Sequence, residues 1–360
     1  MIVIANPRKT DTFVLAAVAI LLSAAAFVYF YIHDKILLYG DAVAHINISR
    51  RVFDSQFPGL SQLGTVWLPL PHLLMLPFIV NDKLWSSGIG GSLVSMAAYV
   101  VGAFGLAKIF WTSAMFVSEG EAGNRPAGWI AAIVYLLNPN LLYLQSTAMT
   151  EPLGLALMIW SIYLYCRFVA EQRNAMLESI DEGSALSHQG SAARAMSGCA
   201  LVLSAAMLTR YDYWFLAGAI AFAVMIQLFI RYRGLGLVRY KLDVLRSLRK
   251  SFLSFVVVLA VVPAFWLAYN QFLFGNAMEF ANGKYSARAI AQRSLQQGNA
   301  PHPGAGDIRV AATYYWKSAR INIGDSSAAA AVVIVAVCGM VLLSFSEFAL
   351  AALLVFPMIF

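Results

Sequence analysis

The chain has 360 residues, of which 60% are hydrophobic and only 12% are charged, whereas a soluble domain carries roughly 45–50% apolar and about 25% charged residues. This shortage of charge excludes a soluble globular enzyme, a disordered protein and a nucleic-acid-binding protein. The net charge of +7 is therefore read as a signal of membrane orientation. Cys166, Cys199 and Cys338 all lie in apolar runs, which excludes a disulfide framework and a thiolate metal site. The composition indicates a polytopic helical membrane protein.

Eight apolar runs are long enough, or nearly so, to cross a bilayer, which takes about 20 residues. In chain order they are 12–32, 88–110, 127–143, 152–169, 197–209, 213–230, 251–272 and 323–345. The first run is long and lacks a small-residue cleavage site, so it is expected to be a retained span. The run 197–209 is short and is expected to extend back toward Arg194. A ninth run starts near Phe348 and stops at Phe360 without a polar flank, which suggests part of a longer protein.

The basic residues orient these spans. Residues 231–250 hold seven Lys and Arg against the single acid Asp243, so this loop is placed in the cytoplasm. Counting spans back from it puts the N-terminus inside as well. Four segments then lie on the outer face, at 33–87, 144–151, 210–212 and 273–322. The inner stretch 170–196 has no periodic apolar face and is predicted to be a flexible linker.

The first outer segment opens with YGDAVAHINISRRVF, in which Asp41 precedes a helical pattern. Asp is a favoured N-cap residue, so the local interpretation is that Asp41 caps this helix. The functional interpretation, compatible with the first, is a carboxylate held at the membrane surface that acts as a general base. His45 lies one turn later on the same face and is expected to hydrogen-bond near Asp41 or to face the loop. Two ligands are too few for a closed metal site, so a divalent metal ion is an alternative that is not favoured.

The apolar stretch LGTVWLPLPHLLMLPFIV in the same segment is interrupted by Pro69, Pro71 and Pro77. Because proline breaks helices, this stretch is not expected to span the membrane. With its tryptophans and His72 it is predicted to lie at headgroup level, partly re-entrant. Two roles stay open for it, membrane packing alone or the lining of a groove for a lipid substrate.

The second and third outer segments contain Glu151, Arg210 and Asp212. Thr-Glu-Pro at 150–152 fits the start of a helix, but an acid at the end of a span needs water or a partner. Glu151 falls on the same side of the membrane as Asp41, so the two acids can face a shared cavity as base and orienting residue. Arg210 and Asp212 stand among aromatic residues and fit a belt in which charges reach the interface. The alternative is that Arg210 binds an anionic headgroup.

The fourth outer segment places Lys284, Arg288 and Arg293 on a predicted helix, with Lys284 and Arg288 one turn apart. One interpretation is that these cations hold the phosphate of a lipid carrier. The competing interpretation is a solvated basic helix near anionic lipid.

Together these motifs resemble the integral-membrane glycosyltransferases of the GT-C class, within it the group of protein O-mannosyltransferases and aminoarabinose transferases. The resemblance is carried by GDAVAHINISRRVFDS, WLPLPHLLM, NPNLLYLQSTAMTEPL and FGNAMEF with KYSAR, and it covers nearly all of the chain. It implies an all-α fold, a polytopic transmembrane bundle with juxtamembrane helices in the first outer segment. Residues 1–360 would form a single transmembrane domain of this type.

The resemblance also implies a donor, a sugar on a polyprenyl phosphate, and an acceptor that is a lipid, a glycan or a protein, with the active face outside the plasma membrane. It maps the first-loop acid of the family onto Asp41 and the acid of the second outer segment onto Glu151. The donor phosphate would be bound by Arg210, Lys284 and Arg288, with His45, Asp212 and Tyr285 in support. Many relatives carry two acids where this chain has Gly40 before Asp41, a departure that weakens a role for a metal ion.

The resulting hypothesis is an inverting transfer in which Asp41 takes the proton of an acceptor hydroxyl and polyprenyl phosphate leaves. An ionised Asp serves at neutral pH because its reference pKa is about 3.9. The rival is a transporter or flippase of a lipid-linked or small anionic substrate. It would place ionisable residues or broken helices near the bilayer midplane, whereas the predicted spans are nearly free of charge. A third possibility is a non-catalytic assembly subunit, in which Asp41 and Glu151 are dispensable.

Overall fold

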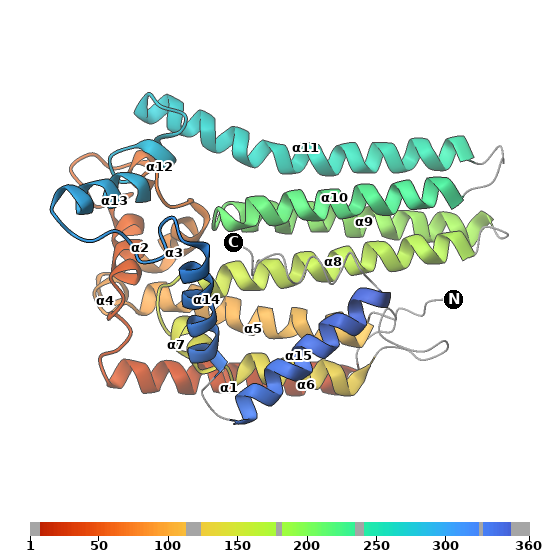
Figure 1. The fold of residues 1–360 in the computed structure, drawn as a ribbon, viewed down its shortest axis with the longest axis horizontal. Helices are drawn as coiled ribbons and strands as arrows, with labels where there is room; N and C mark the ends of the chain where they lie inside the picture. The colour runs from red at the N-terminus through yellow and green to blue at the C-terminus, as the bar shows by residue number, and fades with distance from the viewer. Residues whose placement is uncertain (1–7, 113–123, 178–181, 235–240, 324–326, 347–360) are drawn as a thin grey trace. The chain divides into compact units, whose positions relative to one another are not determined.

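The computed structural model describes residues 8–112, 124–177, 182–234, 241–323 and 327–346, and every regular element within them is a helix (Figure 1). The chain divides into two compact units, residues 1–63 with 68–263 and residues 64–67 with 264–360. The first unit holds α1 to α10 and the first part of α11, and the second holds the rest of α11 and α12 to α15.

The long helices are α1 (Lys9–Ile32), α5 (Ile89–Thr112), α8 (Glu151–Leu177), α9 (Glu182–Met207), α10 (Asp212–Gly234), α11 (Lys241–Phe274) and α15 (Ser327–Ser346). The segment between α1 and α5 forms α2 (Gly40–Arg51), the 3-10 turn η1 (Leu60–Leu63), α3 (Leu70–Ile79) and α4 (Asp82–Ser86). The remaining short helices are α6 (Arg125–Leu136), α7 (Pro139–Gln145), α12 (Glu279–Asn282), α13 (Ala287–Gln296) and α14 (Ile308–Ile323).

Five of the described helices are long and apolar enough to cross a membrane: α1, α5, and parts of α8, α10 and α11. The bent pair of α6 and α7 makes a sixth if it counts as one span. These helices coincide with predicted runs and confirm an all-helical protein whose apolar helices fit a multi-pass membrane protein. The predicted runs 197–209 and 323–345 fall in α9 and α15, which are not among the five, and the run from Phe348 lies outside the described residues.

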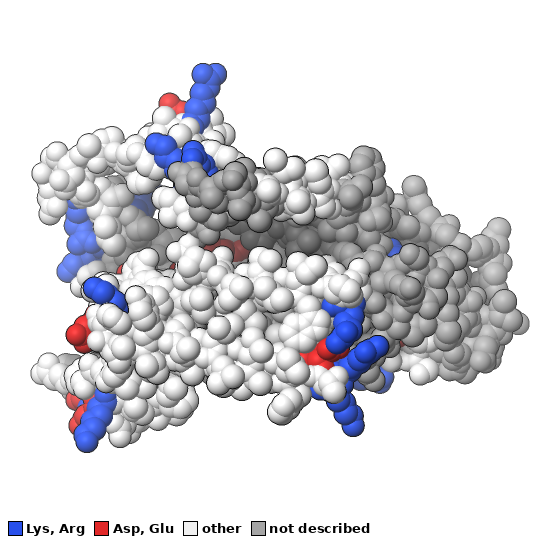
Figure 2. Space-filling view, turned by 90° about the horizontal axis from the view of Figure 1, so that it is seen from below, with Lys and Arg blue, Asp and Glu red and all other residues white. Residues whose placement is uncertain are grey.

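The surface of α1 shows what these helices expose. Phe13, Ile20, Leu21 and Ile32 are each more than half exposed. Figure 2 shows a face of the molecule on which uncharged side chains form a broad surface with few Lys, Arg, Asp or Glu. A large exposed apolar surface marks a site of contact with another apolar phase, and lipid chains provide that phase around a spanning helix.

The predicted span 127–143 is broken, because α6 and α7 meet at an angle of 64°. Proline disfavours the helical conformation for the residue before it, and here Pro139 follows Asn138. The side-chain oxygen of Asn138 accepts a hydrogen bond from the backbone N–H of Leu141 at 3.0 Å, so it caps α7. The hydroxyl of Tyr99 donates to the carbonyl of Leu136 at 2.6 Å. This bond gives a partner to a backbone carbonyl at the C-terminal end of α6. The predicted run 127–143 therefore consists of two helices, and it is a span only if the bent pair counts as one.

The prediction of a flexible linker at 170–196 is wrong, because α8 extends to Leu177 and α9 starts at Glu182. The two helices lie side by side (Figure 1) and bury Glu171 and Asn174. His188 of α9 hydrogen-bonds to Oε2 of Glu171 at 2.7 Å. The missed signal is composition, since Ala, Glu, Gln, Arg and Met are all good helix formers. The expected extension of the run 197–209 toward its N-terminal side is confirmed.

Candidate active site

The predicted site residues divide between the two units. Asp41, Glu151 and Arg210 belong to the first unit, whereas Lys284 and Arg288 belong to the second. Within the first unit, the backbone N–H of residue 70 donates to the carbonyl of residue 208 at 3.0 Å. This bond joins the start of α3 to the turn between α9 and α10, so the first outer segment and that turn meet at one end of the bundle.

Asp41 lies in the first turn of α2 and is exposed. The N-cap residue of α2 is Tyr39, and the cap has no side-chain hydrogen bond. The prediction that Asp41 caps this helix was therefore wrong, because the helix starts at Gly40, one residue earlier. The unpaired N–H groups of the first turn still favour a negative charge at this position, so the carboxylate is stabilised while it remains exposed to a ligand.

His45 is buried and pairs with a second imidazole. Its Nδ1 lies 2.9 Å from Nε2 of His72 in α3, so one ring N–H donates to the other ring nitrogen. The two side chains are 3% and 0% exposed, which rules out the expectation that His45 faces the loop. One turn later, the hydroxyl of Ser49 lies 3.1 Å from the backbone carbonyls of both histidines. These contacts form a polar seam of His45, Ser49 and His72 between α2 and α3, which the sequence analysis missed.

The seam is electrostatically linked to the predicted site. Burial lowers the pKa of His45 to about 4, Asp41 acts to raise it and Arg210 acts to lower it. Burial also lowers the pKa of His72 to about 3, with a further contribution from His45. Both imidazoles are therefore neutral near pH 7. Asp41, in the same helix, and Arg210, in the turn between α9 and α10, therefore both act on the ring of His45.

The polar seam is expected to make the protein less stable as the pH falls from about 6.5 toward 4. A histidine in the unfolded chain has a pKa of about 6.5, so in this window the unfolded state binds protons that the folded seam does not. The free energy of unfolding then falls by about 1.4 kcal/mol per pH unit for each such histidine. Thermal unfolding at pH 7, 6 and 5 measures this slope. His72→Gln is expected to reduce it, whereas His302→Gln, at an exposed position, leaves it unchanged; equal slopes in both variants would contradict the assignment.

Arg210 binds two carboxylates in the turn between α9 and α10. Its Nη1 lies 2.7 Å from Oε1 of Glu151, and its Nε lies 3.0 Å from Oδ2 of Asp212. The side chains of Arg210, Glu151 and Asp212 are 36%, 37% and 54% exposed, so solvent reaches the cluster. Burial acts to lower the pKa of Arg210, but Glu151 and Asp212 raise it overall. Glu151, an acid at the end of a span, therefore has Arg210 as its partner. Arg210 stands among aromatic residues, and it also makes specific bonds to two carboxylates.

The second carboxylate oxygen of Glu151, Oε2, does not contact Arg210 within hydrogen-bond distance. Among the described residues, Oε2 of Glu151 is buried and has no hydrogen-bond partner. A buried acceptor without a partner costs free energy, and such atoms in native structures call for an explanation. Arg210 therefore fixes one carboxylate oxygen of Glu151, and the other oxygen is buried without a partner among the described residues.

The backbone that leads to Glu151 is fixed by side chains of α1 and α5. Ser92 and Ser95 of α5 donate to the carbonyls of Ser146 and Met149, each at 2.9 Å. Ser23 of α1 donates to the side chain of Gln145 at 2.6 Å. These bonds satisfy a short non-helical connection between α7 and α8 that is buried in an apolar environment, where unpaired backbone groups are costly. The start of α8, and with it Glu151, thereby has a defined position.

Gly91→Ala is expected to disturb this connection. A Cβ at Gly91 of α5 would overlap the Cβ of Ala148 and approach Cγ1 of Ile46 to 3.0 Å. Overpacking of this kind costs about 1–3 kcal/mol, so unfolding of the purified protein should begin at a lower temperature. The matched control is Gly218→Ala in α10, where an added Cβ meets nothing within 4 Å. That variant should be neutral or stabilised by up to about 1 kcal/mol; the same stability for Gly91→Ala and wild type would show that the contact relaxes freely.

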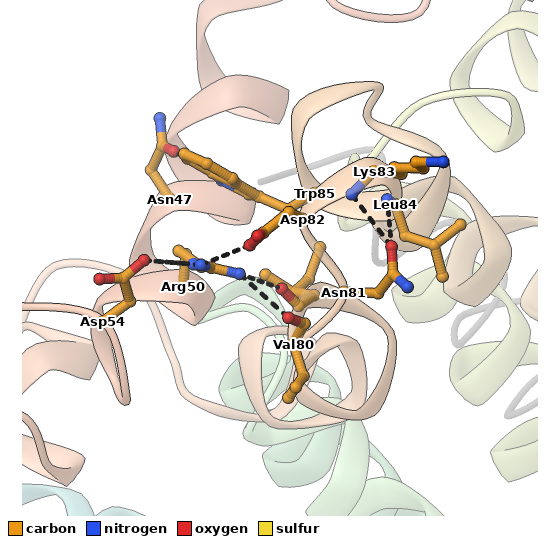
Figure 3. A network of polar contacts seen from close by, with 10 residues as sticks. Asn47, Arg50, Asp54, Val80, Asn81, Asp82, Lys83, Leu84 and Trp85 are labelled. Atoms are coloured by element: carbon orange, nitrogen blue, oxygen red, sulfur yellow. Dashed lines mark hydrogen bonds and ion pairs between the residues drawn. The ribbon is translucent and has the colours of Figure 1, made fainter.

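Arg50 fixes the other end of α2 to the turn between α3 and α4 (Figure 3). Its Nη2 lies 2.7 Å from a carboxylate oxygen of Asp54 and 2.7 Å from one of Asp82. Its Nη1 donates to the carbonyls of Ile79 and Val80 at 3.0 and 3.1 Å. One guanidinium therefore satisfies carbonyls at the C-terminal end of α3, which lack partners within the helix, and joins α2 to α4.

The apolar stretch with three prolines packs within the first unit. Met75 and Ile79 of α3 form a core with Ile46 of α2 and Met149. Trp85 of α4 packs against this core, and its indole N–H donates to the side chain of residue 47 at 3.1 Å (Figure 3). The packing role expected for this stretch is therefore present, and α2, α3 and α4 form a single platform that carries the first acid.

The basic residues of the second unit are arranged differently from the prediction. Ser286 caps α13, which starts at residue 287, so Lys284 precedes the helix and Arg288 lies in its first turn. The prediction that Lys284 and Arg288 share one helical face was wrong, because the serine cap starts the helix between them. The ammonium of Lys284 lies 5.5 Å from the ring centre of Tyr285. The guanidinium of Arg293 donates to the carbonyl of Lys284 at 2.8 Å.

No three His, Cys, Asp or Glu side chains are grouped as ligands for a metal ion in the part of the chain that the structure describes. His45 and His72 bond directly to each other, which occupies a ring nitrogen of each. The charged groups of the candidate site are therefore the carboxylates of Asp41, Glu151 and Asp212 and the guanidinium of Arg210.

No protein-family model matches the chain, and neither a curated protein nor a solved structure is detectably similar to it. What the chain does is therefore argued from its residues. The first unit offers an exposed carboxylate at Asp41, a fixed carboxylate at Glu151, and one cation, Arg210, that two acids share. This set can accept protons and hydrogen bonds from hydroxyl groups at the end of a bundle of apolar helices.

Proposed function

We propose that the protein is a membrane glycosyltransferase that moves a sugar from a polyprenyl-phosphate donor to an acceptor hydroxyl on the outer face of the plasma membrane. The observation that carries this proposal is that the first outer segment and the turn between α9 and α10 meet through the hydrogen bond from Leu70 to Leu208, with Glu151 bonded to Arg210 in that turn. It supports the expectation from the sequence that acids from separate outer segments form one site. The resemblance to GT-C enzymes supplies the class of donor.

Asp41 acts as the general base in this proposal. The acceptor oxygen attacks the anomeric carbon while its proton passes to the carboxylate of Asp41. The bond between the anomeric carbon and the phosphate oxygen breaks, and its electron pair leaves with polyprenyl phosphate. A single displacement of this kind inverts the anomeric configuration. General-base assistance contributes about 10²–10⁴-fold to the rate.

Glu151 orients the reacting groups. Arg210 holds Oε1 of Glu151 at 2.7 Å, so the carboxylate has a fixed position at the start of α8. Asp212 bonds to the same guanidinium and His45 lies within its field. Groups fixed before the substrate arrives contribute most to catalysis, because they need no reorganisation during the reaction.

The donor phosphate requires positive charge. The guanidinium of Arg210 is already shared by Glu151 and Asp212, which reduces the charge that it offers to a phosphate. The resemblance to GT-C enzymes also assigns phosphate binding to Lys284 and Arg288, and both side chains are exposed. Tyr285 supports this role through its contact with the ammonium of Lys284.

A transporter or flippase is the second candidate, and one observation favours it. The bend between α6 and α7 is a discontinuity of the kind that forms substrate sites in many transporters. Gln145 at the end of α7, and Ser146 and Thr147 just after it, are fully buried polar residues. The carboxylates of the candidate site, however, lie at helix starts, as surface chemistry on a lipid requires. The glycosyltransferase is therefore the better supported function.

The proposal is tested by reconstituting the protein in proteoliposomes with polyprenyl phosphates that carry radiolabelled sugars, together with a membrane extract as the source of acceptor. Transfer of label from the lipid to the extract, absent from protein-free liposomes, is the expected result. If the label stays on the lipid with every sugar and extract supplied, transfer is not the activity of this protein.

A further inference from the structure

α14 carries its positive charges on one side. Arg309, Lys317 and Arg320 are separated by eight and three residues, spacings that bring them to one side of a helix with 3.6 residues per turn. The helix contains no acid. Asp307, just before it, accepts hydrogen bonds from the backbone N–H groups of residues 309 and 310 at 2.9 and 3.1 Å, so its carboxylate caps the helix start.

Apart from Thr313, Ser318 and Asn322, the other residues of α14 are apolar or aromatic, and several large side chains among them are exposed. Ile308 and Ile321 are 85% and 78% exposed, and Tyr314, Tyr315 and Trp316 are each about half exposed. Lys317 extends over the ring of Tyr314, with its ammonium 5.8 Å from the ring centre. Tyrosine and tryptophan are the residues that concentrate where a bilayer meets water, because one part of each ring is apolar and another is polar.

The chain itself brings α14 close to a membrane. α11, whose part 252–274 is a candidate span, precedes it, and α15 starts four residues after α14 ends. α15 has 20 residues and no charged side chain, so an apolar environment suits it although it is not among the five candidate spans. α14 has 16 residues and three cations, so it is unsuited to cross a membrane. In the chain, α12 and α13 separate α14 from α11, and α15 follows it.

We propose that α14 lies in the plane of the membrane surface and binds the phosphates of anionic phospholipids through Arg309, Lys317 and Arg320. Its aromatic and aliphatic residues enter the boundary between headgroups and acyl chains. A narrow basic side flanked by apolar residues fits this surface, which presents negative charge and hydrocarbon together. An apolar protein partner would bury the large side chains but would supply no negative charge to the basic side. This inference concerns attachment to lipid and is independent of the reaction that the protein performs.

The orientation of α14 is tested with spin labels on the complete protein in phospholipid nanodiscs. The three native cysteines are replaced by Ala, and one Cys is introduced at Ala312 or at Thr313, neighbours on the apolar and basic sides. In nanodiscs of phosphatidylcholine with phosphatidylglycerol, the label at 312 should be relaxed mainly by dissolved oxygen, which concentrates in lipid. The label at 313 should be relaxed mainly by a water-soluble nickel chelate. Labels that are both in water, or both shielded from the two reagents by protein, would overturn the proposal.

The role of anionic headgroups is tested separately by replacing Arg309, Lys317 and Arg320 with Gln. Each cation near an anionic surface changes the equilibrium between bound and free helix by about fivefold, so the label at 312 should move toward water. In nanodiscs of phosphatidylcholine alone the three replacements should have no effect, which is the matched control. The same behaviour of wild type in both lipid compositions would show that anionic lipid is not the ligand.

Discussion

Asp41→Asn is expected to lower the rate of sugar transfer by about 10²–10⁴-fold, the usual contribution of a general base. The amide has nearly the shape of the carboxylate but cannot accept the proton of the acceptor hydroxyl. Asp41 is exposed and makes no cap bond in α2, so the stability of the fold should hardly change. Steady-state transfer rates and thermal unfolding of the same preparation give the two readings.

The matched control is Asp34→Asn, which removes a carboxylate from the same outer segment. Asp34 is exposed and has a φ of 55°, a conformation that Asn adopts about as readily as Asp. Its replacement should leave the transfer rate close to that of wild type. Equal rates for Asp41→Asn and Asp34→Asn would remove Asp41 from the mechanism.

Arg210→Met is expected to lower transfer by about 10- to 100-fold, because it removes charge-assisted hydrogen bonds to Glu151 and Asp212. Glu151 would lose the group that fixes its orientation, and two carboxylates would repel each other. Because the cluster is partly exposed, the cost in stability should stay within about 1 kcal/mol. Transfer rates at saturating and limiting donor, with thermal unfolding, separate the effect on turnover from the effect on folding.

Two further variants make this prediction specific. Arg210→Lys keeps the charge but not the planar set of donors that spans two carboxylates, so it should restore only part of the rate. Arg194→Met in α9 removes a guanidinium that hydrogen-bonds to Ser191, and it should have little effect on transfer. If Arg210→Met and Arg194→Met behave alike, the bridge between Glu151 and Asp212 has no part in the reaction.

Much of the fold was predictable because hydrophobic length is a strong signal in a membrane protein. The runs at 12–32 and 88–110 correspond closely to α1 and α5. Prediction failed where polar residues are satisfied by partners distant in the chain. Glu171 is buried against His188, and a single sequence does not show that pairing, so a helical hairpin was interpreted as a linker. The break at Asn138 and Pro139 had a local signal that its apolar surroundings masked.

The sequence predicted which charged residues belong to the candidate site, but it did not predict which side chains bond to each other. Sequence spacing placed Asp41 and His45 on one face of a helix, and α2 has that spacing. It gave no indication that His72, distant in sequence, is the partner of His45. Likewise, Arg210 was assigned to a phosphate, whereas the structure pairs it with Glu151 and Asp212. Bonds between outer segments depend on how the helices pack, which periodicity within one segment does not report.

The central claim is that the protein breaks the bond between a sugar and a polyprenyl phosphate. It is tested most directly with a donor labelled with tritium in the sugar and with phosphorus-32 in the phosphate, supplied to the protein in proteoliposomes with a membrane extract. The account predicts that the two labels separate, with phosphorus-32 retained on the lipid and tritium in a new product. If the labels cross the bilayer together on an intact lipid, the protein is a flippase and the account is contradicted.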